Sequence, residues 1–120
     1  MEKPLEPSNE HARLNALLNT ALLDSEPEKR FDRITLLAKA ALNVPMVMVT
    51  LVDAERQWFK SKQGVSVTET SREVSFCAHT ILDSDVFQVS DAREDANKSR
   101  ACDNSFLIIE PDHVTSTYLC

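Results

Sequence analysis

Glycine is almost absent from this sequence, because Gly64 is the single example in 120 residues. Loops that bind phosphate groups in nucleotide-binding proteins contain several glycines, so loops of the P-loop and dinucleotide-binding kinds are excluded. The three cysteines, Cys77, Cys102 and Cys120, lie far apart and form no CxxC pair, which argues against a zinc-ribbon or thioredoxin-like site. An odd number of cysteines favours a reducing compartment, and we expect a cytoplasmic protein.

Long apolar runs and clustered basic residues are missing too. The longest apolar run, 44–52, contains Pro45 and Thr50 and is far shorter than the ~20 residues of a membrane-spanning helix. The first seven residues carry Glu2 and Glu6 without an apolar segment, unlike a signal peptide. The formal net charge is −6, and the basic residues are scattered among acids, whereas a nucleic-acid binder normally carries a basic patch. We therefore expect neither a membrane span nor a nucleic-acid partner.

The chain length and the 42% hydrophobic content fit one domain with one core. Residues 1–8 contain two prolines and several charges, and we expect them to be a flexible leader. The domain itself is expected to span residues 9–120.

Two amphipathic helices are predicted at the start of this domain. The first covers about 9–23, where one apolar stripe recurs at helical spacing: Leu14, Leu17, Leu18, Ala21 and Leu22. Ser25 and Glu28 form the pattern of a capping box, so a second helix is expected to run from there to about Leu42, with Asn43 as its C-terminal cap. Its wide apolar stripe, which includes Ile34 and Leu37, predicts that it is more buried than the first helix.

The rest of the pattern indicates an antiparallel sheet. Residues 46–52 are apolar and rich in β-branched side chains, which is typical of a central strand covered on both faces. A turn at 53–56 and the imperfect alternation of 57–62 predict that these segments form a hairpin. A short helix at 75–82 and later strands at 86–89 and 114–119 follow, with the apolar segment 106–109 between these strands. Helices and antiparallel strands in separate runs indicate an α+β fold with the helices packed on the sheet.

Four segments resemble bacterial GAF domains, in the order and spacing of that family. They are 22–34 (LLDSEPE, then FDRI), 47–61 (VMVTLVD, then RQWFKS), 70–82 (TSREVSFCAHTIL) and 86–92 (VFQVSDA). Similar domains stand at the N-termini of diguanylate cyclases (GGDEF proteins), cyclic-dinucleotide phosphodiesterases and sensor histidine kinases. The resemblance implies a GAF-like central antiparallel sheet with helices on one face and a small-molecule pocket on the other. It also implies an output domain of the GGDEF, EAL or histidine kinase type in the full-length protein.

The C-terminal end departs from the family pattern. Residues 114–118 are polar where the family has an aromatic-rich strand, and the last strands and closing helix of the domain would lie beyond Cys120. We therefore expect a strand outside this chain to cover the edge of the central strand that faces away from the hairpin. Such an exposed edge would make the chain dimeric or marginally stable.

Cys77 and His79 are the first candidate site residues. Residues at i and i+2 of a helix point to nearly opposite sides, so the two side chains cannot act as a pair. Cys77 shares its face with Ile81 and is expected to be buried in the core. GAF domains that attach a bilin have Cys followed directly by His, whereas Ala78 intervenes here, so we expect no cofactor. His79 is interpreted as a hydrogen-bonded structural histidine, with ligand contact as the alternative.

Three further residues complete the set of ligand-binding candidates. Trp58 could stack on a ligand or serve as a half-buried core residue. Arg93 and Arg100 lie in and near the loop 91–95, which forms a lid over the pocket in GAF domains, and their forked donors suit an anionic group. No catalytic constellation and no metal-binding motif is recognisable in the sequence.

The preferred interpretation is a regulatory domain that senses an unknown small molecule and is not an enzyme. Two alternatives stay open. One is an interaction module without a ligand, which forms a homodimer through the first helix. The other is a cysteine-dependent enzyme similar to free-methionine sulfoxide reductases, with Cys77 and Cys102 as the reactive residues.

Overall fold

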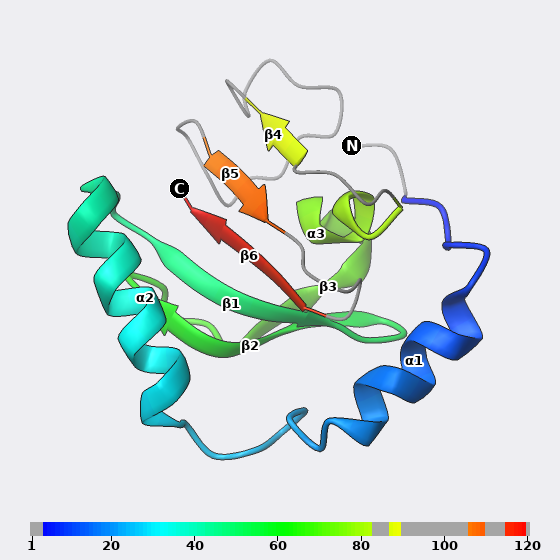
Figure 1. The fold of residues 1–120 in the computed structure, drawn as a ribbon. Coiled ribbons are helices and arrows are strands. Elements are labelled where there is room, and N and C mark those ends of the chain that lie inside the picture. The colour runs from blue at the N-terminus through cyan, green and yellow to red at the C-terminus, as the bar shows by residue number, and fades with distance from the viewer. Residues whose placement is uncertain (1–3, 83–86, 90–105, 110–114, 120) are drawn as a thin grey trace.

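The chain is built around one antiparallel sheet of six strands in the order β3-β2-β1-β6-β5-β4 (Figure 1). The computed structural model describes residues 4–82, 87–89, 106–109 and 115–119, with side chains for residues 4–82. The helical elements are α1 (Glu10–Asn19), α2 (Lys29–Leu42), the 3₁₀ turn η1 (Arg72–Val74) and α3 (Phe76–Thr80). The strands are β1 (Val47–Val52), β2 (Arg56–Gln63), β3 (Glu69–Ser71), β4 (Phe87–Val89), β5 (Phe106–Ile109) and β6 (Thr115–Leu119). The predicted α+β fold with a GAF-like sheet is confirmed.

β1 is the central strand, and all six of its residues are buried. Alternate side chains of a strand point to opposite faces of the sheet. Met48 and Val52 point to the α3 side, where they pack in one cluster with Phe76, Cys77 and Ile81. The other three apolar residues of the strand point to the opposite face: Val47, Val49 and Leu51. The predicted burial of this strand on both faces is confirmed.

The two edges of β1 are covered by β2 and by β6. β1 pairs antiparallel with β2 in the predicted hairpin and with β6 through Val47↔Leu119 to Leu51↔Thr115. The expectation that a strand beyond residue 120 covers this second edge is therefore wrong. Hydrogen bonding to the backbone does not depend on side-chain polarity, which explains why the polar segment at 115–119 can fill the position.

A β-bulge in β2 accounts for the imperfect alternation of this strand. Thr50 is opposite Phe59 and Val49 is opposite Ser61, so Lys60 has no partner on β1. Lys60 and Ser61 consequently both reach the α2 side of the sheet. Lys60 Nζ donates to Ser25 Oγ and to the Glu26 carbonyl, each at 2.6 Å, and Ser61 Oγ lies 2.9 Å from Thr35 Oγ1.

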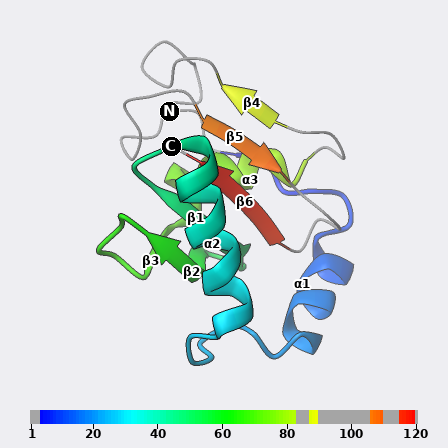
Figure 2. The ribbon, with the colours of Figure 1, turned by 60° about the vertical axis from the view of Figure 1, so that its left-hand side comes forward.

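The helix α2 lies along one face of the sheet (Figure 2) but buries little of its apolar stripe. Thr35 is its one buried residue, whereas Ile34, Leu37 and Leu42 are 53%, 71% and 54% exposed. α1 buries Arg13 and Leu17, so the prediction that α2 is the more buried helix is wrong. The physical reason is that α2 docks on β2 through polar groups, since Asp32 Oδ1 accepts from Ser61 Oγ at 2.6 Å and Gln63 Nε2 donates to Thr35 Oγ1.

The helix boundaries test the predicted caps. α1 ends at Asn19, four residues before the predicted end, and Ala21 beyond it is left-handed with φ 55°. The predicted capping box is wrong, because α2 begins at Lys29 without a side-chain cap while the Ser25 hydroxyl holds Lys60. Asn43 adopts the left-handed conformation expected of a C-terminal cap, with φ 50°.

The predicted short helix at 75–82 is confirmed as α3, whose Ser75 cap accepts a hydrogen bond from the Ala78 amide at 3.0 Å. α3 packs on the face of the sheet opposite α2, where Cys77 Sγ meets Thr50 Oγ1. β3 and η1 form in the polar stretch between β2 and α3.

The backbone conformation at Gly64 requires glycine, and a substitution at this position tests that requirement. Its φ is +75°, and a Cβ built on it would lie 2.1 Å from the Pro45 carbonyl oxygen. We expect Gly64→Ala to lower the free energy of unfolding by about 2–4 kcal/mol, since left-handed strain adds to a backbone clash. Urea denaturation measures this, with Ser66→Ala in the same exposed loop as the control. A change below about 0.5 kcal/mol would show that the 63–65 backbone relaxes freely.

Candidate functional site

The α3 face of the sheet contains a buried polar cluster. Cys77 is 0% exposed, and its Sγ lies 3.3 Å from Gln57 Nε2 and 3.4 Å from Thr50 Oγ1. The predicted burial of Cys77 is confirmed. A reactive thiolate needs solvent exposure and an electropositive environment. The buried Cys77 thiol has no such exposure, so we interpret it as a core residue.

The structure does not bring the candidate ligand residues into one site. His79 is half-buried on α3, and its position two residues after Cys77 turns it away from the thiol. Trp58 is opposite Leu51 in the β1–β2 ladder and therefore lies on the other face of the sheet from Cys77. Trp58 and His79 thus cannot line the same pocket. Arg93, Arg100, Cys102 and the segment 91–95 lie outside the described residues. The ligand roles of the two arginines and the redox role of Cys102 stay predictions.

Trp58 contributes to a cavity of about 360 Å³, which we call the Trp58 groove. One wall is formed by β2 and the other by the connection between α1 and α2 and by the first turn of α2. Ten residues line it: Ser25, Pro27, Asp32, Trp58, Phe59, Lys60, Ser61, Lys62, Gln63 and Thr68. Sequence analysis identified Trp58 but missed the neighbouring Asp32 and Ser61, because the β-bulge that brings these strand and helix groups together has no signature in a single sequence.

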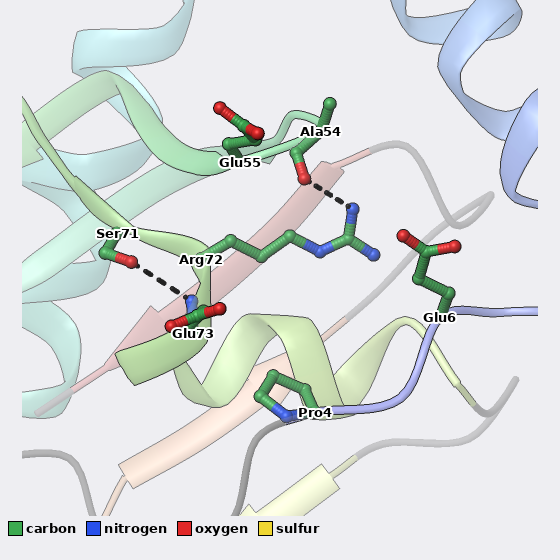
Figure 3. A pocket seen from close by; sticks show the side chains of 7 residues that line it. All are labelled: Pro4, Glu6, Ala54, Glu55, Ser71, Arg72 and Glu73. Atoms are coloured by element: carbon green, nitrogen blue, oxygen red, sulfur yellow. Dashed lines mark hydrogen bonds between the residues drawn. The ribbon is translucent and has the colours of Figure 1, made fainter.

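A second cavity, of about 410 Å³, lies where the N-terminal segment meets the β1–β2 turn and η1 (Figure 3). Arg72 runs across it, and its guanidinium donates to the carbonyls of Asp53 and Ala54 at 3.1 and 3.3 Å. The remaining lining residues are Pro4, Glu6, Ala54, Glu55, Ser71 and Glu73. We call this the Arg72 cavity.

Arg72 also belongs to a charged cluster that ties α1 to the rest of the molecule. Glu10 accepts from Arg72 and from Arg13, and Arg13 Nη1 donates to the carbonyl of Val52 at the end of β1. The Arg13 hydrogen bond, together with that of Arg72, holds the pKa of Glu10 at about 2, against an ordinary value of 4.5, although burial acts in the opposite direction. Sequence analysis missed this cluster because Glu10 and Arg72 are 62 positions apart.

Two other kinds of feature are absent from the part of the chain that the structure describes. Within residues 4–82 and the described strands, no three His, Cys, Asp or Glu side chains are grouped so that they could hold a metal ion. None of the described helices is long and apolar enough to cross a membrane.

Comparison with known proteins gives one sequence relative and several structural ones. The chain is 33% identical over 111 residues, or 92% of its length, to a cyclic di-GMP phosphodiesterase of Pseudomonas aeruginosa. It spans only 18% of the length of that curated relative. No family model matches the chain.

Two solved structures illustrate the fold likeness. A type II free methionine-R-sulfoxide reductase from Thermoplasma acidophilum is similar with a TM-score of 0.65 and 10% identity, over 86% of this chain and 75% of the other. The GAF domain of a phosphoenolpyruvate-protein phosphotransferase from Coxiella burnetii is similar with a TM-score of 0.62 and 12% identity, over 92% and 76% of the two chains. At such low identity these likenesses concern the fold.

The Glu10 cluster predicts a pH-dependent stability. Because the folded pKa of Glu10 lies below 4.5, its ionised carboxylate stabilises the fold above that pH, and the stabilisation is lost as the pH falls towards about 2. We expect Glu10→Gln to lower the free energy of unfolding at pH 7 by up to about 3 kcal/mol and to have little effect near pH 2. Denaturation at several pH values measures this. The control is Glu26→Gln, which removes an equal charge from an exposed side chain. An equal loss at pH 7 and pH 2 for Glu10→Gln would contradict the assigned cause.

Proposed function

We propose that this chain, which has the fold of a GAF domain, is a regulatory module that passes a ligand signal to an output domain and does not itself catalyse a reaction. The observation that carries the proposal is the alignment with the phosphodiesterase. Nearly the whole chain matches, yet it matches only 18% of the relative, as expected of one module in a longer protein. By this relation the output domain would act on cyclic di-GMP as a phosphodiesterase of the EAL type, rather than as a cyclase or a kinase. We place the protein in the cytoplasm, with 9–120 as the sensory domain.

The proposed mechanism is a shift of population between two packings of the helices on the sheet. A ligand that prefers one packing shifts the equilibrium by its differential affinity for the two states. The unknown small molecule would bind on the α3 face, near His79, with Arg93 and Arg100 as candidates for its anionic group. η1 immediately precedes α3 and is joined to α1 through Arg72 and Glu10, which gives the α3 face a physical connection to the N-terminal helix.

The second candidate function is a protein-interaction module, which the exposed apolar side chains favour. Ile34 and Leu37 on α2 and Leu18 on α1, which is 64% exposed, have no cover from the described residues. Ile34 and Leu37 are three residues apart on α2 and therefore share a face of this helix, and apolar side chains that gather on one surface mark interaction sites. A homodimer through α1 alone would bury little apolar surface, so we propose that α2 contributes to any such interface.

A sulfoxide-reductase activity has support only from the fold likeness. That chemistry would need an accessible thiolate, whereas Cys77 is enclosed by Thr50 and Gln57. We rank this alternative last.

The regulatory proposal is tested in a chimera of the Pseudomonas aeruginosa phosphodiesterase in which this chain replaces the matching segment. We expect the isolated chain to leave cyclic di-GMP intact and the chimera to hydrolyse it. Arg72→Gln in the chimera should change the rate of hydrolysis by roughly twofold or more, because coupling energies between sites are commonly at least of that size.

The matched control is Arg33→Gln, which removes an equal charge from the exposed side of α2. Hydrolysis of cyclic di-GMP by the isolated chain would contradict the proposal. Equal rates for all three chimeras would also contradict it, provided that each shows the same melting temperature.

A further inference from the structure

We propose that the outward face of α2 binds an acidic amphipathic helix of a partner protein. The proposal rests on the second candidate function, the protein-interaction module, and it names the chemistry of the partner. Two features of α2 carry it. The first is an exposed apolar stripe, and the second is positive charge at one end of that stripe.

The exposed stripe of α2 has the spacing of a helix–helix contact. Ile34, Leu37 and Ala41 stand at i, i+3 and i+7 and therefore lie along one face. All three are exposed, whereas Thr35 on the sheet-facing side is buried against β2. Such a row of side chains packs between those of a neighbouring helix, and the small Ala41 allows a close approach. Because α2 has 14 residues and is about 21 Å long, the partner segment is a helix of about four turns.

Positive charge stands at the N-terminal end of this stripe. α2 carries four basic residues and one acid, in a chain whose net charge is −6. Lys29 forms no ion pair with any side chain that the structure describes, and Arg30 shares the Glu28 carboxylate with the buried Lys60, at 2.9 and 2.7 Å. One carboxylate thus serves two cations, so this end of α2 keeps a net positive charge.

These charges do not stabilise the helix that carries them. The N-terminus of a helix is the positive end of its dipole, where anions are favoured and cations are not. Lys29 and Arg30 are the first two residues of α2. Their charge is therefore better matched by negative groups outside the helix than by the helix itself.

A helix with carboxylates beside its apolar residues matches both features, whereas two other partners do not. A second α2 has one acid, Asp32, which is bound to Ser61 on the sheet side and cannot reach Lys29 of another copy. Helices that insert into a lipid surface present Trp or Phe to it. The stripe contains neither, and the one aromatic residue of α2, Phe31, is covered by Arg30, whose guanidinium lies 4.8 Å from the ring centre.

The probe for this proposal is a fluorescein-labelled synthetic helix of about three heptads, with Leu at positions a and d and Glu at e and g. The glutamates also keep the peptide from pairing with itself, because like charges repel. Its anisotropy is recorded while the chain is added. We expect saturable binding that weakens as the salt concentration rises. A peptide with Gln in place of Glu should bind roughly tenfold more weakly, and one with Lys more weakly still.

Two pairs of variants locate the binding surface. Leu37→Gln should weaken binding roughly tenfold, because Leu37 is 71% exposed in the middle of the stripe. Its control is Val67→Gln, which alters an apolar side chain that is 49% exposed in the loop after β2. Lys29→Glu should weaken binding of the Glu peptide and strengthen binding of the Lys peptide. Its control is Lys39→Glu, four residues after Thr35 and thus on the sheet-facing side.

An absence of saturable binding to the Glu peptide would overturn the proposal, as would equal weakening by Leu37→Gln and Val67→Gln. The opposite effects expected of Lys29→Glu on the two peptides cannot arise from a loss of folding. Binding to vesicles of phosphatidylserine and phosphatidylcholine, without binding of the peptide, would assign the face to a membrane instead. None of these measurements involves hydrolysis of cyclic di-GMP, so failure here is distinguishable from failure of the regulatory proposal.

Discussion

The burial of β1 on both faces is the constraint on which the other elements depend. Each of its apolar side chains contributes about 1.5–3 kcal/mol only if another layer covers it. α3 and the Phe76–Cys77 cluster cover one face, and the helical layer with Leu17 covers the other. β2 and β6 complete the hydrogen bonding at its two edges. β1 therefore divides the molecule into two faces, and the sheet separates Cys77 on the α3 side from Trp58 on the other side.

The helical layer is attached to this core mainly through polar contacts. α1 is held by the Arg13 bond to the Val52 carbonyl and by the Glu10 bonds to Arg72. The connection to α2 is held by Lys60, and α2 itself by the hydroxyls of Thr35 and Ser61. Contacts of this kind depend on direction and charge more than on apolar area. A helical layer held in this way can change its position while the apolar core stays intact, which is the property that the proposed regulatory mechanism requires.

The sequence predicted those features whose causes are local. The apolar run at 46–52 identified β1, the Asn43 cap was recognised, and Cys77 was correctly assigned to the core. The errors arose where tertiary contacts prevailed. The stripe of α2 predicted burial, but the β-bulge presents Lys60 and Ser61 to the helices, and the helix is rotated towards these polar partners. The candidate site was only partly predictable. The sequence identified Trp58 and His79 as candidates, but it did not show that they lie on opposite faces of the sheet.

Hydrogen exchange of the β1 backbone amides in the intact chain tests the central claim most directly. If β1 is the buried divider that every other element requires, its amides should exchange slowest, with an opening free energy close to that of global unfolding. Amides in α1 and α2 should exchange through smaller openings, since polar contacts hold these helices. Exchange of the β1 amides as fast as those of α2 would contradict this account of the fold and of its two independent faces.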